Sequence, residues 1–154
     1  MFAFNGIAVL LAALLAWITY TDIKTLRIPD ACNLALAALG FGAAIVTGTP
    51  TLADSLIGSL VALAVFGTVK LGYRALRQRD GLGMGDVKFI AAAGLWVGWF
   101  GLPWLTLVAS VSGLIMYLSD ALVWGASPGK RLPFGPHLAL GLLATWLAIQ
   151  YGLL

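Results

Sequence analysis

Long apolar stretches recur along the whole of this 154-residue chain, and each is about the length of a transmembrane helix. A helix crosses the roughly 30 Å hydrocarbon layer of a bilayer with about 17 to 25 residues. We place these stretches at residues 3–21, 31–48, 54–72, 88–103, 104–125 and 135–153. The fourth stretch ends in the Gly101–Pro103 turn, which leaves almost no loop before the fifth. The sequence therefore predicts an all-α polytopic membrane protein with about six transmembrane helices.

The composition agrees with a helical bundle in lipid. Hydrophobic residues make up 61% of the chain and charged residues 10%, whereas charged residues alone are about 25% of a typical soluble domain. We expect one transmembrane domain over residues 1–154. The stretch Phe2–Tyr20 has no basic residue before it and is followed by Lys24 and Arg27, so we interpret it as a retained helix and not as a signal peptide.

The basic residues show which connections lie on the same side of the membrane. All nine fall in three clusters, at 24–27 after the first stretch, at 70–88 where the third stretch leads into the fourth, and at 130–131 between the fifth and sixth. Lysine and arginine are enriched in cytoplasmic loops, so these three connections are expected in the cytoplasm and both termini outside. Such short clusters are a topology signal and not a nucleic-acid footprint. We expect the lipid bilayer, and no nucleic acid, as a partner.

Two aspartates lie at the cytoplasmic ends of predicted helices. Asp22 ends the first stretch and Asp86 begins the fourth. Two carboxylates held close in a partly desolvated site cannot both ionise, so one can activate water while the other, protonated, polarises a peptide carbonyl. Gly83 and Gly85 precede Asp86, and residues without Cβ allow a substrate to approach the backbone closely. Judged on topology alone, a pair of solvated interface residues explains these aspartates equally well.

The helix dipoles predict different roles for the two aspartates. A carboxylate is favoured where a helix begins, so we expect Asp86 to be the base and Asp22, at the end of a helix, to hold the shared proton. The other aspartates have plainer interpretations. We predict that Asp30 and Asp54 are helix N-caps, that Asp80 is a solvated loop charge, and that Asp120 pairs with Lys130 or Arg131.

Other chemistries are poorly supported by the sequence. With His137 as the only histidine and no glutamate, the His-Glu-x-x-His pattern of metalloproteases is excluded, and we expect no metal and no cofactor. In a straight fifth helix, Ser112 would lie on the order of 20 Å from the cytoplasmic end, so we expect that it does not meet His137. Cys32 is the only cysteine, and we interpret it as a small packing residue.

Three motifs together resemble the type IV prepilin peptidase family. They are the first motif, Asp22–Asp30, the second motif, Gly83–Lys88 with its Gly-x-Gly-Asp sequence, and the third motif, Pro133–Gly141. The resemblance covers essentially the whole chain. It implies an aspartyl endopeptidase that removes the basic leader of prepilins or pseudopilins at the cytoplasmic face of the bacterial inner membrane. It also implies that Asp22 and Asp86 are the catalytic pair, and that Gly83, Gly85 and Lys88 support them.

The chain departs from longer members of that family. Those members carry a cytoplasmic domain with two Cys-x-x-Cys pairs and also N-methylate the new terminus. This sequence resembles the short form associated with Flp/Tad-type pili, without the Cys-rich and methyltransferase domain. A small transporter or channel, with Asp22, Asp86 and Asp120 along a polar pathway, is the alternative, although neither a midplane charge nor a repeat supports it. The sequence does not specify which prepilin is cut, how it enters or the oligomeric state.

Overall fold

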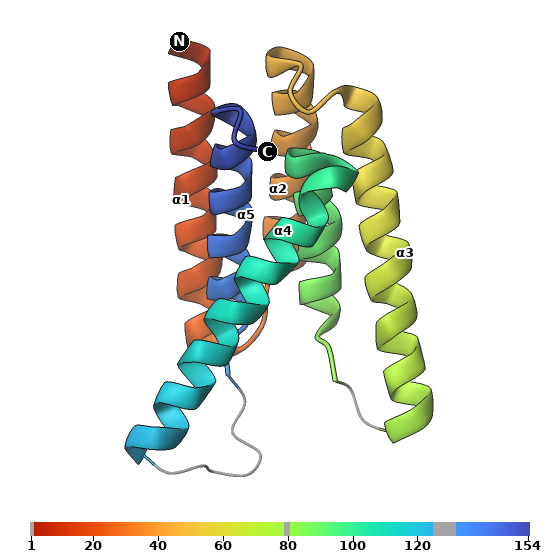
Figure 1. Cartoon of the computed structure of the whole chain (residues 1–154), viewed down its shortest axis with the longest axis vertical. Coiled ribbons are helices and arrows are strands. Elements are labelled where there is room, and N and C mark those ends of the chain that lie inside the picture. Colours follow the sequence, from red (N-terminus) through yellow and green to blue (C-terminus); the bar gives the residue numbers. More distant parts are fainter. Residues whose placement is uncertain (1, 79–80, 125–131) are drawn as a thin grey trace.

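The computed structural model describes residues 2–78, 81–124 and 132–154 and is built from α-helices (Figure 1). The prediction of an all-α fold is confirmed. The helices are α1 (Phe2–Thr25), α2 (Asp30–Thr47), α3 (Leu52–Arg77), α4 (Met84–Trp124) and α5 (Gly135–Gln150).

The first turns of α2 and α3 differ from the predicted N-caps. Asp30 is the first residue of α2, and Pro29 before it makes no side-chain cap. Thr51 caps α3: its hydroxyl oxygen accepts the Asp54 N–H at 3.2 Å, and the hydroxyl donates to the Asp54 carboxylate at 2.6 Å. The N-cap predictions for Asp30 and Asp54 are therefore wrong, because both helices begin earlier than the apolar pattern suggested. Asp54 instead lies three residues after the cap, where its carboxylate accepts from the Thr51 hydroxyl.

Helix α4 covers both the fourth and the fifth predicted stretches. Its break lies at Gly98, with φ 66° and ψ −179°, and not at the predicted Gly101–Pro103 turn. Figure 1 shows that the chain reverses direction here, so the first half of α4 (84–97) and the second half (99–124) run in opposite directions. Glycine adopts positive φ without steric cost, whereas Pro103 lies inside the second half.

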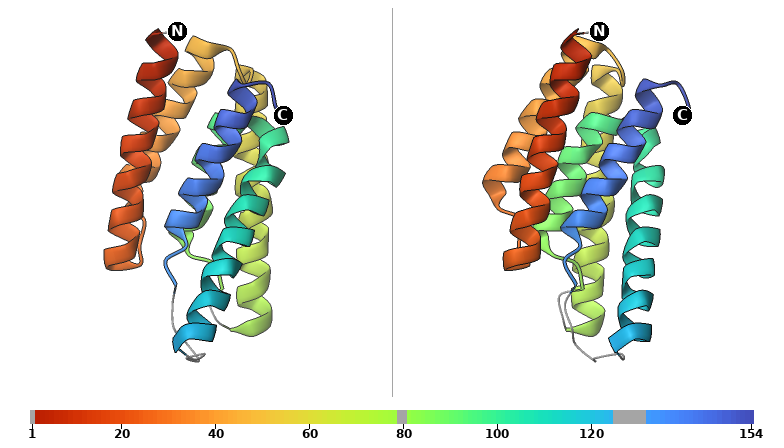
Figure 2. Two further views of the ribbon diagram at one scale, coloured as in Figure 1. Left: turned by 60° about the vertical axis from the view of Figure 1, so that its left-hand side comes forward. Right: turned by 90° about the vertical axis from the view of Figure 1, so that its left-hand side faces the viewer.

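The helices alternate in direction as the basic connections predicted. Figures 1 and 2 show both termini at one end of the bundle, together with the turn between α2 and α3 and the reversal in α4. The C-terminal ends of α1, α3 and α4 lie toward the opposite end. The helices α1 to α4 contain spans long and apolar enough to cross a membrane, and α5, with 16 residues, is shorter. Six membrane passes, two of them within α4, remain a prediction.

A tryptophan pair joins three helices at the centre of the bundle. Trp96 of α4 packs edge-on against Trp146 of α5, with ring centroids 5.8 Å apart. The Trp96 indole N–H also donates to the Leu36 carbonyl of α2 at 2.9 Å. The outer faces remain apolar: Leu60, Leu71 and Leu122 are 67%, 67% and 86% exposed. Exposed apolar surface on this scale suits contact with lipid and not with water.

Helices α3 and α4 cross closely enough for their backbones to touch at two glycines. A Cβ at Gly94 would lie 2.6 Å from the Gly58 carbonyl carbon, and one at Gly58 would lie 2.7 Å from the Gly94 oxygen. Small residues permit this close packing of membrane helices. We expect Gly94→Ala to lower the free energy of unfolding by about 1–3 kcal/mol, because backbone atoms must move apart. Thermal unfolding in detergent measures the effect.

Gly72→Ala is the matched control for this prediction. Gly72 lies in α3 with no atom within 4 Å of its built Cβ, and alanine is the better helix former by roughly 0.5–1 kcal/mol. This control should unfold at the same temperature as the unsubstituted chain or higher. Equal melting temperatures for Gly94→Ala and Gly72→Ala would show that the close crossing does not limit stability.

Candidate active site

Asp22 and Asp86 line one pocket of about 320 Å³, a volume within the usual range for small-molecule sites. Asp22 is buried, with 4% of its surface exposed, and Asp86 is partly exposed. All three sequence motifs contribute to the wall, which is made by Asp22, Leu26, Arg27, Ile28, Gly83, Met84, Gly85, Asp86, Leu132, Pro133 and Phe134. Motifs that are far apart in the sequence therefore form a single cavity.

Asp22 lies in the last turn of α1 and faces the beginning of α5. Its Oδ2 atom accepts the backbone N–H of Gly135 at 2.8 Å. The first N–H groups of a helix have no partner within the helix, so Asp22 supplies one from another helix. A Cβ at Gly135 would lie 2.8 Å from Oδ2 and 2.9 Å from the Cβ and Cγ atoms of Asp22. Only glycine permits this approach between the first and third motifs.

This contact removes the basis for the predicted difference between the two aspartates. The prediction assumed that only Asp86 lies where a helix begins, whereas Asp22 also faces a helix N-terminus, that of α5. The sequence missed this because Asp22 belongs to the end of one helix and the contact comes from a different helix. The dipole argument therefore does not distinguish a base from an acid.

Asp86 lies in the first turn of α4, and its carboxylate is hydrogen-bonded by the Gly83 backbone amide of its own motif. The Asp22 carboxylate and the Lys70 ammonium both lie within electrostatic reach of Asp86. The site thus pairs two carboxylates in one cavity, each with a backbone N–H donor. This arrangement suits a pair that shares one proton and acts on a water molecule between them.

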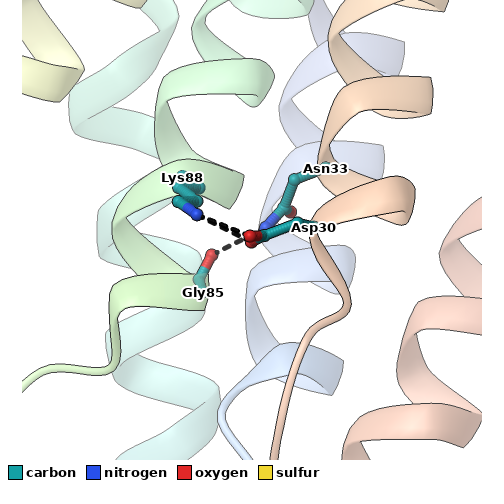
Figure 3. Close-up of polar contacts among 4 residues, drawn as sticks. All are labelled: Asp30, Asn33, Gly85 and Lys88. Atoms are coloured by element: carbon teal, nitrogen blue, oxygen red, sulfur yellow. Dashed lines mark hydrogen bonds and ion pairs between the residues drawn. The ribbon is translucent and has the colours of Figure 1, made fainter.

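The first turn of α2 holds the second motif in place (Figure 3). Lys88 Nζ lies 2.8 Å from both carboxylate oxygens of Asp30, and Asn33 Nδ2 donates to the Gly85 carbonyl at 3.2 Å. The ion pair is well exposed, with 43% and 74% of the side chains accessible, so it contributes about 0–1 kcal/mol. Asn33 is buried, with 5% exposed.

Asn33 was missed by the sequence analysis, although a signal was present. It is a polar residue inside an apolar stretch, three residues after Asp30, and its partner Gly85 lies three residues before Lys88. Residues three apart lie on the same face of a helix. Two contacts with matching spacing therefore join α2 to α4.

The prediction that Ser112 and His137 do not meet is wrong. Ser112 Oγ and His137 Nδ1 are 3.0 Å apart. The second half of α4 extends beyond the beginning of α5, as Figures 1 and 2 show, so α5 starts beside the middle of this half and not at its end. Depth in the membrane therefore cannot be read from the distance to a helix end.

The pair still does not form an activated serine. The Ser112 hydroxyl also lies 3.1 Å from the Ala109 carbonyl, which competes with His137 Nδ1 for its proton. An activated nucleophile also has to reach the substrate. Neither residue lines the pocket of the two aspartates. The contact therefore joins α4 to α5 and does not supply a nucleophile.

The remaining candidates lie apart from the pocket or outside the described residues. Cys32 is buried in the core, which confirms its interpretation as a packing residue. Asp120 is in the second half of α4 and does not line the pocket, and its predicted partners Lys130 and Arg131 lie outside the described residues, as does Asp80. In the described ranges, no three His, Cys, Asp or Glu residues are grouped to hold a metal ion.

Comparison with known proteins identifies the family. The model of the type IV leader peptidase family matches residues 9–118. The leader peptidase HopD of Escherichia coli is 36% identical over 146 residues, which cover 94% of each chain. A prepilin leader peptidase/N-methyltransferase of Aeromonas hydrophila is 32% identical over 151 residues, 96% of this chain and 51% of the relative. No solved structure is significantly similar.

The lengths of these relatives differ. The chain spans about half the length of the Aeromonas hydrophila protein but nearly the full length of HopD. The matched residues 9–118 include the complete first and second motifs, with both pocket aspartates. This match covers well over half of the chain, and it agrees with the all-helical fold and with the pocket that the motifs form. The chain belongs to the type IV leader peptidase family.

Proposed function

We propose that this chain is a prepilin peptidase, an aspartic endopeptidase whose catalytic residues are Asp22 and Asp86. Its substrate is a prepilin or pseudopilin, and its product is the protein without its basic leader, cut at the cytoplasmic face of the bacterial inner membrane. The observation that carries the proposal is the pocket in which three distant motifs bring these carboxylates together. The names of the relatives, prepilin leader peptidase and leader peptidase, support the substrate class.

The chemistry needs only the two carboxylates and water. The ionised aspartate removes a proton from water as its oxygen attacks the scissile carbonyl carbon, while the protonated aspartate donates to the carbonyl oxygen. The resulting tetrahedral intermediate breaks its C–N bond, and the leaving nitrogen takes up a proton from the pair. Gly83 and Gly85 lie on the pocket wall, where the absence of side chains leaves room for an extended substrate.

A transporter or channel is less consistent with this geometry. A polar pathway would place charged groups along the bundle, whereas Asp22 and Asp86 share one pocket and Asp120 does not line it. We expect the purified chain in vesicles to remove a prepilin leader and to carry no proton current. A gel measures the cleavage, and a pH-sensitive dye inside the same vesicles measures proton entry. Proton entry without cleavage would favour the channel.

Membrane orientation gives a separate prediction. The ends of α1 and α3 bear basic residues, so we expect them in the cytoplasm. In a Cys32→Ala background, Thr25→Cys and Gln78→Cys should react with an impermeant thiol reagent only from the cytoplasmic side. Thr49→Cys and Leu153→Cys should react only from outside. All four positions are exposed, so reaction of Gln78→Cys from outside would contradict the orientation.

A further inference from the structure

Lys70 of α3 is a buried lysine beside the active site, with 9% of its surface exposed. In the sequence it counted only toward the charge of a cytoplasmic connection. Its Nζ atom donates to the Leu82 carbonyl, two residues before the start of α4, at 2.9 Å. Removing a lysine from water is costly unless its charge is compensated. The Leu82 contact and the nearby Asp86 supply that compensation.

One peptide group joins Lys70 to Asp86. The Leu82 carbonyl accepts from Lys70, and the N–H of the same peptide group, which belongs to Gly83, donates to the Asp86 carboxylate. The C=O and N–H of a planar trans peptide point in opposite directions. A cation on one side and a carboxylate on the other therefore determine the orientation of this peptide plane. Hydrogen bonds arranged in such a chain polarise and strengthen one another.

We propose that Lys70 is a positioning residue for the reaction. It orients the Leu82–Gly83 peptide, and through that peptide it holds the Asp86 carboxylate toward Asp22. Lys70 does not line the aspartate pocket, so it acts through Gly83 and not by contact with substrate. The kinetic part of this inference rests on the proposed peptidase function.

Three variants test the role by kinetics. Lys70→Met keeps the aliphatic chain and removes the charge and the donor, Lys70→Arg keeps both, and Arg74→Met removes an exposed charge one turn later in α3. A misplacement of about 1 Å at a reacting group can cost about 10²-fold in rate. We expect Lys70→Met to lower kcat by about that factor with little change in KM, Lys70→Arg to recover most of the loss, and Arg74→Met to behave like the unsubstituted enzyme.

Three kinetic outcomes would overturn the proposal. One is an unchanged kcat in Lys70→Met, and another is a loss that appears only in KM. A third is Lys70→Arg losing as much kcat as Lys70→Met in variants whose melting temperatures match. Should Lys70→Met fail to fold in detergent, Lys70→Gln, which lacks the charge, takes its place in the same comparison.

A measurement without substrate separates this proposal from the peptidase function itself. In ¹⁵N-labelled full-length protein, the Gly83 amide signal reports both hydrogen bonds of its peptide group. We expect Lys70→Met and Asp86→Asn each to shift this signal, and Arg74→Met to leave it in place. An unshifted Gly83 signal in Lys70→Met would refute the positioning role. If no prepilin is cleaved by the unsubstituted chain, the peptidase proposal fails, and this shift still decides the role of Lys70.

Discussion

Replacement of either pocket aspartate by asparagine is expected to abolish leader cleavage while the helical bundle stays folded. Asparagine keeps the shape of the side chain, and its amide can neither take a proton from water nor give one to the carbonyl. Each general acid or base contributes about 10²–10⁴-fold to the reaction rate. When two residues act as one catalytic unit, removing either costs about as much rate as removing both. We therefore expect Asp22→Asn, Asp86→Asn and the double variant to lose activity by a similar factor, about 10³-fold or more.

Gel analysis of prepilin processing by purified variants measures this loss. Asp54→Asn and Asp120→Asn are the controls, because neither residue lines the pocket, and both should retain substantial activity. Melting temperatures near that of the unsubstituted chain establish that the inactive variants are folded. Robust cleavage by Asp22→Asn or Asp86→Asn would refute the assignment of the catalytic pair.

Gly135→Ala should cause the second large loss, at a position that carries no chemical group of its own. The new Cβ would lie 2.8–2.9 Å from three atoms of Asp22, so either the carboxylate or the beginning of α5 must move. Because a displacement of a reacting group by about 1 Å can lower the rate by about 10²-fold, we expect kcat to fall by roughly this factor. The backbone N–H remains, so the cause would be steric and not the loss of a donor.

Gly113→Ala is the matched control for this effect. Its Cβ would meet the Phe134 ring at 3.4 Å and the His137 ring at 3.7 Å, which are ordinary van der Waals contacts near the same helix start. In steady-state kinetics, the kcat of Gly135→Ala should be more than tenfold lower than that of Gly113→Ala. Equal activities would show that the contact between Asp22 and Gly135 does not position the carboxylate.

The pairing of the three motifs was predictable from the sequence, because alternating helices bring basic connections to the same end. Asp22 and Asp86 both border such connections, so helix direction alone placed them at the same face of the membrane. The three motifs together then indicated the family. The pocket adds that the two residues line one cavity, and their catalytic role is a proposal.

The contacts between helices were not predictable, because they depend on how each helix is rotated and how deep it starts. The sequence predicted the break at the Gly101–Pro103 turn, yet Gly98 takes the positive φ and packs against α3, with Asp54 Cβ at 3.4 Å from its built Cβ. The start of α5 beside the middle of the second half of α4 brought His137 to Ser112 for the same kind of reason. Lys70 belonged to a basic cluster in sequence, and only the helix rotation buries it.

The cleavage position, determined on purified components, tests the central claim most directly. The unsubstituted chain, Asp22→Asn and Asp86→Asn are each reconstituted in liposomes with a prepilin, and both products are identified by mass spectrometry. We predict a single cut by the unsubstituted chain, between the basic leader and the apolar helix of the substrate, and no product from either variant. A cut at another place, or the same cut by Asp22→Asn or Asp86→Asn, would contradict the account.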